Sequence, residues 1–121
     1  MLHKAVGSKD VKEVCKLLKI QYINVNERDR TMQTPLHVAA THKDNTRIFE
    51  MLIGKKGVDP NATDKSSYTP LHVACSECNI FAINELLDHP KIDVKAYFFV
   101  YSQIINNCIN CVGNKNKCSR Q

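Results

Sequence analysis

The sequence predicts an all-α repeat solenoid, a stack of helix pairs, on three observations. The hexapeptide Thr-Pro-Leu-His-Val-Ala occurs at residues 34–39 and again at residues 69–74, a separation of 35 positions. Each copy is followed by a second apolar stretch with the spacing of a helix. The 121 residues contain no Trp, four Gly and four Pro, a composition that argues against a turn-rich all-β fold. A repeat period of this length is typical of stacked helical units.

A third and weaker copy of the repeat opens the sequence. Residues 2–6 read Leu-His-Lys-Ala-Val and lie 34 positions before residues 36–40. Every unit then has a second apolar stretch and a closing phrase that mixes polar and apolar residues. The second stretches are residues 14–18, 48–52 and 83–87, and the closing phrases are residues 24–26, 58–61 and 92–95. Three matching blocks in each unit indicate a true internal repeat.

The first helix of each unit is predicted from its opening residues. Pro35 and Pro70 have a fixed φ and no N–H, which suits the first turn of a helix. Thr34 and Thr69 precede them as N-caps, because their hydroxyls can accept a backbone N–H. Small and aliphatic residues form the packed side, namely Leu36, Ala39 and Ala40 in one unit and Leu71, Ala74 and Cys75 in the next.

A second helix is predicted after a short polar break in each unit. Apolar residues recur in it at helical spacing, as Ile48, Met51 and Leu52 in one unit and as Ile83, Leu86 and Leu87 in the next. The closing phrase at residues 58–61, Val-Asp-Pro-Asn, cannot extend a helix and is read as an extended turn. Each unit is therefore predicted to be a helix pair followed by a projecting turn.

The Thr-Pro-Leu-His-x-Ala motif, with a period near 33 residues, resembles the ankyrin repeat. The resemblance covers about residues 1–96 and implies helix-turn-helix repeats that stack and are joined by β-hairpin-like loops. We divide the chain into a truncated first repeat that serves as an N-terminal cap (1–28), two repeats (29–63 and 64–96), and a partly disordered non-repeat tail (97–121). The motif residues with structural roles are Thr34, Pro35, Leu36, His37 and Ala39, and Thr69, Pro70, Leu71, His72 and Ala74. The resemblance implies that each motif His forms a hydrogen bond between repeats.

The sequence departs from the family pattern at its usual glycines. Met32 and Ser67 stand where the hairpin tip usually has Gly, and both are disfavoured at positive φ, so strained or differently shaped tips are expected. The Gly usually found between the two helices is replaced by Lys9, Lys43 and Cys78. Two family positions are kept in the first two units, as Asn26 and Asn61 in the closing phrases and as Asp29 and Asp64 at the start of the hairpins, whereas Lys95 replaces the third Asn.

Both ends of the repeat region are unusual. The sequence begins within a repeat, which is expected either of a cap or of a fragment or late-starting gene product. After residue 96 the periodicity stops, and the aromatic and β-branched run at residues 97–105 favours a strand over a helix. This run is expected either to cover the exposed face of the third repeat or to be aggregation-prone. The abrupt join also suggests a splice variant or a truncated reading frame.

Composition and charge exclude several classes of function. The formal net charge is +5, but residues 1–96 carry only +2 with mixed signs, so we expect no nucleic-acid partner. No apolar run is long enough for a membrane helix, so no membrane insertion is expected. The N-terminus does not resemble a secretory signal, so we expect an intracellular protein, cytoplasmic or nuclear. No phosphate loop, nucleophile elbow or close carboxylate pair occurs, so we predict neither an enzyme nor a small-molecule substrate.

The six cysteines are expected to be thiols, and no metal or cofactor is predicted. Cys75 and Cys78 form one Cys-x2-Cys pair and Cys108 and Cys111 another, with Cys118 beyond them. Such pairs can bind zinc, which leaves a zinc-stabilised module as a less favoured alternative. Against it, Cys75 replaces a packed Ala and is expected to face the core.

The predicted function is a non-catalytic, intracellular protein–protein interaction module. The resemblance implies a binding surface made of hairpin tips and the exposed side of the first helices. The tip residues are Arg28, Arg30, Thr31, Gln33, Lys65, Ser66 and Tyr68, and the inner-helix residues are Val38, Thr41, His42, Val73, Ser76 and Glu77. The basic tips suggest an acidic or phosphorylated stretch on the partner protein. Open alternatives are a fragment or short isoform of a larger scaffold or channel, a decoy similar to viral inhibitors of Rel-type transcription factors, and a degenerate remnant without a dedicated partner.

Overall fold

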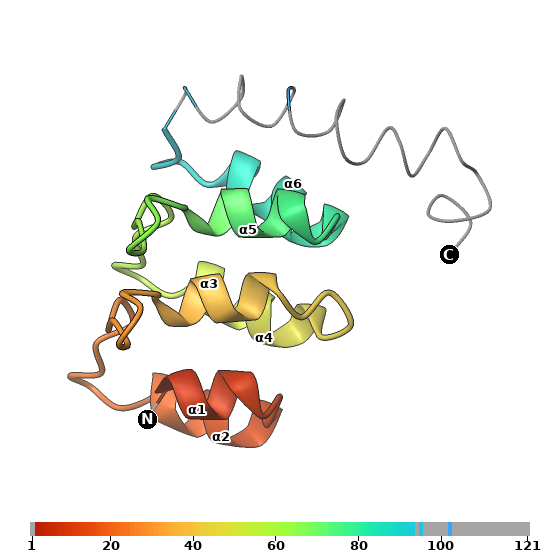
Figure 1. Cartoon of the computed structure of the whole chain (residues 1–121). Helices are drawn as coiled ribbons and strands as arrows, with labels where there is room; N and C mark the ends of the chain where they lie inside the picture. The colour runs from red at the N-terminus through yellow and green to blue at the C-terminus, as the bar shows by residue number, and fades with distance from the viewer. Residues whose placement is uncertain (1, 94, 96–101, 103–121) are drawn as a thin grey trace.

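A computed structural model describes residues 2–93, together with Lys95 and Ser102. In this part of the chain, six helices form three pairs that stack in one direction (Figure 1). The pairs are α1 (Leu2–Gly7) with α2 (Val11–Leu18), α3 (Pro35–Ala40) with α4 (Thr46–Ile53), and α5 (Pro70–Ser76) with α6 (Ile80–Asp88). The predicted all-α stack of helix pairs is therefore confirmed.

The helices stack in two rows. The inner helices α1, α3 and α5 pack on one another in order, the outer helices α2, α4 and α6 do the same, and each inner helix also packs on the outer helix of its own pair. None of these helices is longer than nine residues, and isolated helices of that length are marginal in water. Their stability therefore comes from contacts within and between pairs.

The inner helices α3 and α5 begin as the sequence predicts. Thr34 and Thr69 are the N-caps, and their hydroxyls accept the backbone N–H of His37 and His72 respectively. The Nδ1 atom of each imidazole in turn accepts the backbone N–H of its threonine, so both hydrogen bonds of the capping box are formed. In this box a His occupies the position where Glu or Gln is usual.

The N-caps of the outer helices are Asp10, Asn45 and Asn79. The side chain of each accepts the backbone N–H of the residue three positions later. Those third residues are Glu13, Ile48 and Ala82, so Ile48 corresponds to Ala82. The repeat spacing predicts that Ile48 corresponds to Ile83, and this prediction is wrong by one position. The reason is one extra residue between α3 and Asn45, which shifts the second helix relative to the motif.

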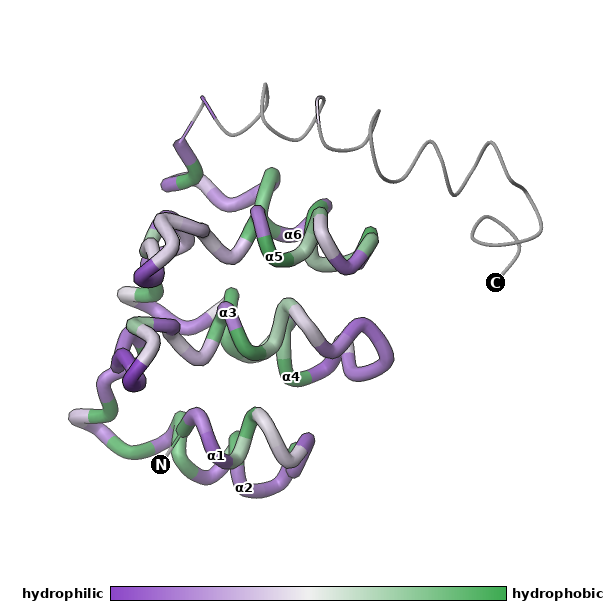
Figure 2. The backbone as a smooth tube through the Cα atoms, viewed as in Figure 1, coloured by the Kyte–Doolittle hydropathy of each residue, from purple (hydrophilic) through white to green (hydrophobic). Residues whose placement is uncertain are grey.

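The core runs without interruption through all three pairs. Small residues at the centre of the inner row, Ala39, Ala40, Ala74 and Cys75, are at most 1% exposed, so the helix backbones approach closely. Between the outer helices, Phe49 and Phe81 meet edge to face with ring centroids 6.4 Å apart. Figure 2 shows that hydrophobic residues gather in the helices and hydrophilic ones in the loops between them.

The loops between pairs are tight turns rather than strands in the described residues. In the first of these hairpin loops (29–33) the Asp29 N–H donates to the Gln33 carbonyl and the Met32 N–H donates to the Asp29 carbonyl. Met32 and Ser67 both have φ of 66°, the left-handed conformation that the sequence analysis regarded as unfavourable for them. Lys9 and Cys78 also have positive φ, whereas Lys43 does not, because the second repeat has one more residue between its motif and the N-cap of its second helix.

The expected disordered tail (97–121) lies outside the described residues, apart from Ser102. The same holds for the strand expected at residues 97–105. At Ser102 the backbone is helical rather than extended.

Replacing Met32 or Ser67 with Gly should stabilise the fold by about 0.5–1 kcal/mol each, because Gly removes the Cβ that makes positive φ costly. Urea unfolding monitored by circular dichroism measures the change. Met32→Ala is the control, since it shortens the side chain but keeps the Cβ, and it should give no gain. A gain with Met32→Ala equal to that with Met32→Gly would contradict the strain argument.

Candidate functional site

The two hairpin loops (29–33 and 64–68) are held by aspartates. The Asp29 Oδ1 accepts the Thr31 N–H at 2.9 Å, the Thr31 hydroxyl at 2.8 Å and the Gln33 N–H at 2.9 Å. In the second loop the Asp64 Oδ1 accepts the N–H groups of Ser66 and Tyr68 at 2.8 and 3.0 Å. These hydrogen bonds fix the shape of each hairpin loop in the absence of a partner.

The aspartate pKa values reflect these bonds. Burial by itself would raise the pKa of Asp29, but hydrogen bonds from Gln33 and Thr31 outweigh it and lower the pKa. The pKa of Asp64 is lowered in the same way, with bonds from Tyr68 and Ser66 outweighing burial. Both carboxylates are therefore ionised at neutral pH and serve as acceptors inside the hairpins.

A histidine joins each hairpin to the repeat before it. The His37 side chain is fully buried, and its Nδ1 accepts the Thr34 N–H at 3.1 Å. Because Nδ1 is an acceptor, the proton is on Nε2, which donates to the Tyr68 carbonyl at 2.8 Å. In the preceding repeat, His3 Nε2 lies 2.7 Å from the Gln33 carbonyl. Each hairpin is thus attached at its last residue to the neighbouring repeat.

Two asparagines join the closing phrases of successive repeats. The Asn26 side-chain amide donates to the Gly57 carbonyl at 2.9 Å, and its Oδ1 accepts the Asp59 N–H at 2.8 Å. Asn61 repeats the pattern with the Lys91 carbonyl at 2.7 Å and the Asp93 N–H at 3.0 Å. An amide is suited to this position because it carries a donor and an acceptor together.

The two hairpin loops are also connected to each other. The Lys65 N–H donates to the Thr31 carbonyl at 3.1 Å. The Arg28 guanidinium donates to the Thr63 carbonyl, so this side chain is directed along the surface toward the next hairpin. The hairpin side of the stack therefore forms one continuous edge (Figure 1).

The residues predicted to contact a partner lie on the hairpin loops, just before the first of them at Arg28, or on α3, α5 and the loops that follow these helices. Exposed members are Arg28, Arg30, Thr31, Thr41, Lys65, Ser66, Tyr68, Ser76 and Glu77, and half-buried members are Gln33, Val38, His42 and Val73. Tyr68 is the most distinctive, since its side chain is 53% exposed and its ring stacks on His72 with centroids 5.5 Å apart and planes 8° apart. The motif residues lie behind this surface, with Thr69 and His72 half-buried and the other eight buried.

Sequence reasoning missed two side chains that hold the stack together. Lys55, in the loop after α4, donates to the Leu18 carbonyl at the end of α2 over 2.7 Å. Asn79, the N-cap of α6, is only 3% exposed and donates to the Ala40 carbonyl at the end of α3 over 3.0 Å. The only signal for Asn79 was its place in the polar break before a helix.

The described cysteines do not form a metal site. Cys75 is fully buried, and burial, with a smaller effect of Cys78, raises the pKa of its thiol to about 11. A protonated core thiol is a poor metal ligand. Within the described residues, no group of three or more His, Cys, Asp or Glu side chains is placed to hold a metal ion. Cys108, Cys111 and Cys118 lie outside the described residues.

Residues 2–97 match the family described as "Ankyrin repeats (3 copies)". The search of curated proteins found no match. Among the described helices, none has both the length and the apolar character needed to cross a bilayer.

Lowering the pH below about 6.5 should destabilise the protein, because the folded state resists protonation of His37. Burial lowers the pKa of His37 from its ordinary value of 6.5, although the Tyr68 carbonyl and the Asp64 and Asp29 carboxylates act in the opposite direction. Burial also lowers the pKa of His72. The unfolded chain then binds more protons below pH 6.5, so the free energy of unfolding falls as pH falls.

Urea unfolding between pH 7 and pH 5 measures this effect. His37→Gln should be less stable at pH 7 but should depend less on pH than the unmodified chain. The Asp29 and Asp64 contributions are lost only below about pH 4, since their lowered pKa values start from an ordinary 3.8. An unchanged pH dependence in His37→Gln would contradict this assignment.

Asn61→Ala should lower the free energy of unfolding by about 1 kcal/mol, because it leaves the Lys91 carbonyl and the Asp93 N–H without their partner. Asn84→Ala, an equal truncation at an exposed position of α6, should change it by less than about 0.5 kcal/mol. Thermal melts of the three proteins measure both changes. Equal effects of the two substitutions would show that Asn61 does not join the repeats.

Proposed function

The chain belongs to the ankyrin-repeat family, and from this membership we propose that it is a non-catalytic module that binds a partner protein inside the cell. Ankyrin repeats are generally protein-binding modules, are typically non-catalytic and usually occur in intracellular proteins. A stack of short helices offers an extended surface rather than an enclosed reaction centre.

The main support is the preorganised hairpin edge. Asp29 and Asp64 hold the tips from within, and each tip is also attached to the repeat before it through His3 or His37. A surface that is already ordered loses little conformational entropy on binding, so more of the contact energy appears as affinity. Tyr68, exposed but supported by His72, is the residue type that often dominates protein interfaces.

The charge of this edge favours an acidic or phosphorylated stretch on the partner. Arg30 and Lys65 are exposed on successive hairpin loops. The two aspartates of the same loops remain ionised, but their carboxylates accept backbone N–H groups within the loop. Arg30 and Lys65 are the charged tip side chains that we expect to pair with negative side chains of a partner.

The same surface also fits the chain as part of a larger scaffold, in which these repeats contribute one segment of a longer binding edge. A decoy role would use the surface to compete with a related protein for a shared partner. Both versions need the exposed tip residues, so one set of substitutions tests the surface itself.

Peptides selected by phage display against the unmodified chain should be enriched in Asp and Glu. Tyr68→Ala should weaken their binding at least tenfold by loss of a central aromatic contact, and Arg30→Glu with Lys65→Glu should weaken it similarly by charge repulsion. Isothermal titration calorimetry with a synthetic copy of the selected peptide gives the dissociation constants.

The matched control is Lys12→Glu with Lys19→Glu, which makes the same change in net charge at exposed positions on and just after α2. It should leave peptide binding within about threefold. An equal loss of binding in the control would show a general effect of net charge. Selection of peptides without acidic residues would contradict the proposal that the partner segment is acidic.

A further inference from the structure

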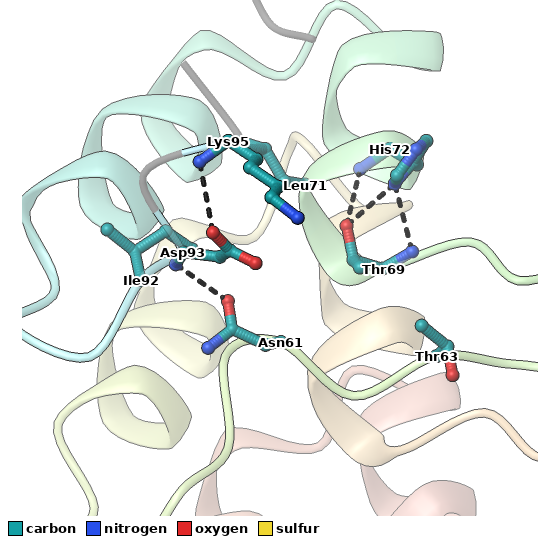
Figure 3. A pocket seen from close by; sticks show the side chains of 8 residues that line it. All are labelled: Asn61, Thr63, Thr69, Leu71, His72, Ile92, Asp93 and Lys95. Atoms are coloured by element: carbon teal, nitrogen blue, oxygen red, sulfur yellow. Dashed lines mark hydrogen bonds between the residues drawn. The ribbon is translucent and has the colours of Figure 1, made fainter. Parts of the chain in front are cut away.

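The cavity on the third repeat is lined by groups that already serve the stack. It has a volume of about 300 Å³ and lies beside Asn61, between the start of α5 and the closing phrase at Ile92 (Figure 3). Asn61 accepts the Asp93 N–H there, and the Thr69 hydroxyl caps α5. The side chains around this cavity therefore have structural roles.

The loop that follows α2 exposes two large apolar side chains. Ile20 is 47% exposed and Tyr22 is 87% exposed, the highest value for a large hydrophobic residue in the described part of the chain. Counted from the helix N-caps, the corresponding positions after α4 hold Lys55 and Gly57. The repeat itself therefore does not require apolar residues at these two positions.

Lysines surround these two apolar side chains. Lys16 lies four residues, about one helical turn, before Ile20, and Lys19 directly precedes it. The Lys55 side chain reaches the same place from the next repeat, since its amino group donates to the carbonyl of the last residue of α2 over 2.7 Å. Lys56 follows in that loop. These residues define the lysine–tyrosine patch, which consists of Lys16, Lys19, Ile20, Tyr22, Lys55 and Lys56.

Positive charge is concentrated in this patch. Residues 16–22 and 54–57 contain four lysines and no Asp or Glu. Lys55 is half-buried, whereas the other three lysines are exposed. Acidic residues occur just outside these two ranges, namely Glu13, Glu50 and Asp59. Glu13 lies 4.0 Å from Lys16 in an exposed ion pair, an arrangement that contributes little and leaves the lysine accessible.

An exposed Tyr and Ile among lysines match the chemistry of an anionic lipid surface. Tyr is enriched at the boundary between headgroups and acyl chains, because its ring is apolar and its hydroxyl is polar. Lysines near the surface are attracted to anionic headgroups, and their aliphatic stems can lie along the apolar layer. A projecting side chain enters a bilayer without a preformed pocket, whereas a protein partner would have to supply one.

We infer that the lysine–tyrosine patch attaches the chain to the surface of an anionic lipid bilayer. Tyr22 and Ile20 enter the headgroup region, and the lysines contact the negative charges of the lipids. The attachment is peripheral, and since it uses few side chains it is weak, reversible and reduced by added salt. The patch shares no residue with the hairpin edge, so lipid binding and peptide binding can be measured separately.

Fluorescence of the Tyr22→Trp full-length variant tests the contact at one position, because the chain contains no Trp. Vesicles of phosphatidylcholine with about 30% phosphatidylserine should shift its emission to shorter wavelength, and vesicles of phosphatidylcholine alone should not. Ile80→Trp is the matched control, since Ile80 is 52% exposed and lies at the opposite end of an outer helix. An equal shift in the control, or no shift for Tyr22→Trp, overturns the inference.

Vesicle sedimentation tests the lysines. Lys19→Glu with Lys56→Glu should weaken binding to the anionic vesicles at least tenfold. Lys43→Glu with Arg47→Glu makes the same change in net charge at exposed positions near the start of α4, and should change binding less than threefold. Equal losses for the two pairs overturn the assignment to this patch.

Soluble poly-glutamate distinguishes a lipid surface from an acidic protein segment. The expected result is that it leaves the emission of Tyr22→Trp unchanged, because it offers charge but no apolar layer. A shift as large as that with anionic vesicles would show that the patch takes an acidic peptide, and would overturn the inference.

Discussion

The fold depends on one buried link, the imidazole of His37 shared between its own helix and the next repeat. Its Nδ1 accepts the Thr34 N–H, which caps α3, and its Nε2 donates to the Tyr68 carbonyl in the following hairpin. Local helix initiation and long-range stacking are therefore joined in one side chain. Because Nδ1 is an acceptor and the ring is buried, the folded state favours the neutral imidazole. Protonation removes the acceptor for the Thr34 N–H, whereas the Nε2–H can still donate to the Tyr68 carbonyl.

The hairpin edge, the surface proposed to bind a partner, is shaped by hydrogen bonds within its own loops. The carboxylates of Asp29 and Asp64 accept N–H groups within the loops, whereas Arg30 and Lys65 are exposed on them. Met32 and Ser67 hold a left-handed conformation in these loops without being Gly. Such strain persists where surrounding bonds determine the loop shape, and it occurs here beside the surface proposed to bind.

Much of the fold could be predicted from local sequence signals. Thr-Pro at residues 34–35 and 69–70 indicates helix starts, and the apolar spacing after them indicates pairs of packed helices. Both signals involve residues within one or two helical turns, so no knowledge of the tertiary structure is needed. The register of the second helix was wrong by one residue in α4, because a single insertion in a loop changes which residues face the core without changing the composition.

The sequence by itself therefore determined the helix pairs, their caps and the residue types on the exposed tips. Beyond the link expected of the motif histidines, only the tertiary structure decided which polar groups connect the repeats, since Lys55 reaches Leu18 and Asn79 reaches Ala40 across more than 35 positions of the chain. It also decided that Arg28 extends toward Thr63 and that Tyr68 rests on His72. These contacts depend on how one repeat is rotated and shifted on the next. That placement is fixed by packing over the whole interface, so short sequence patterns do not predict it.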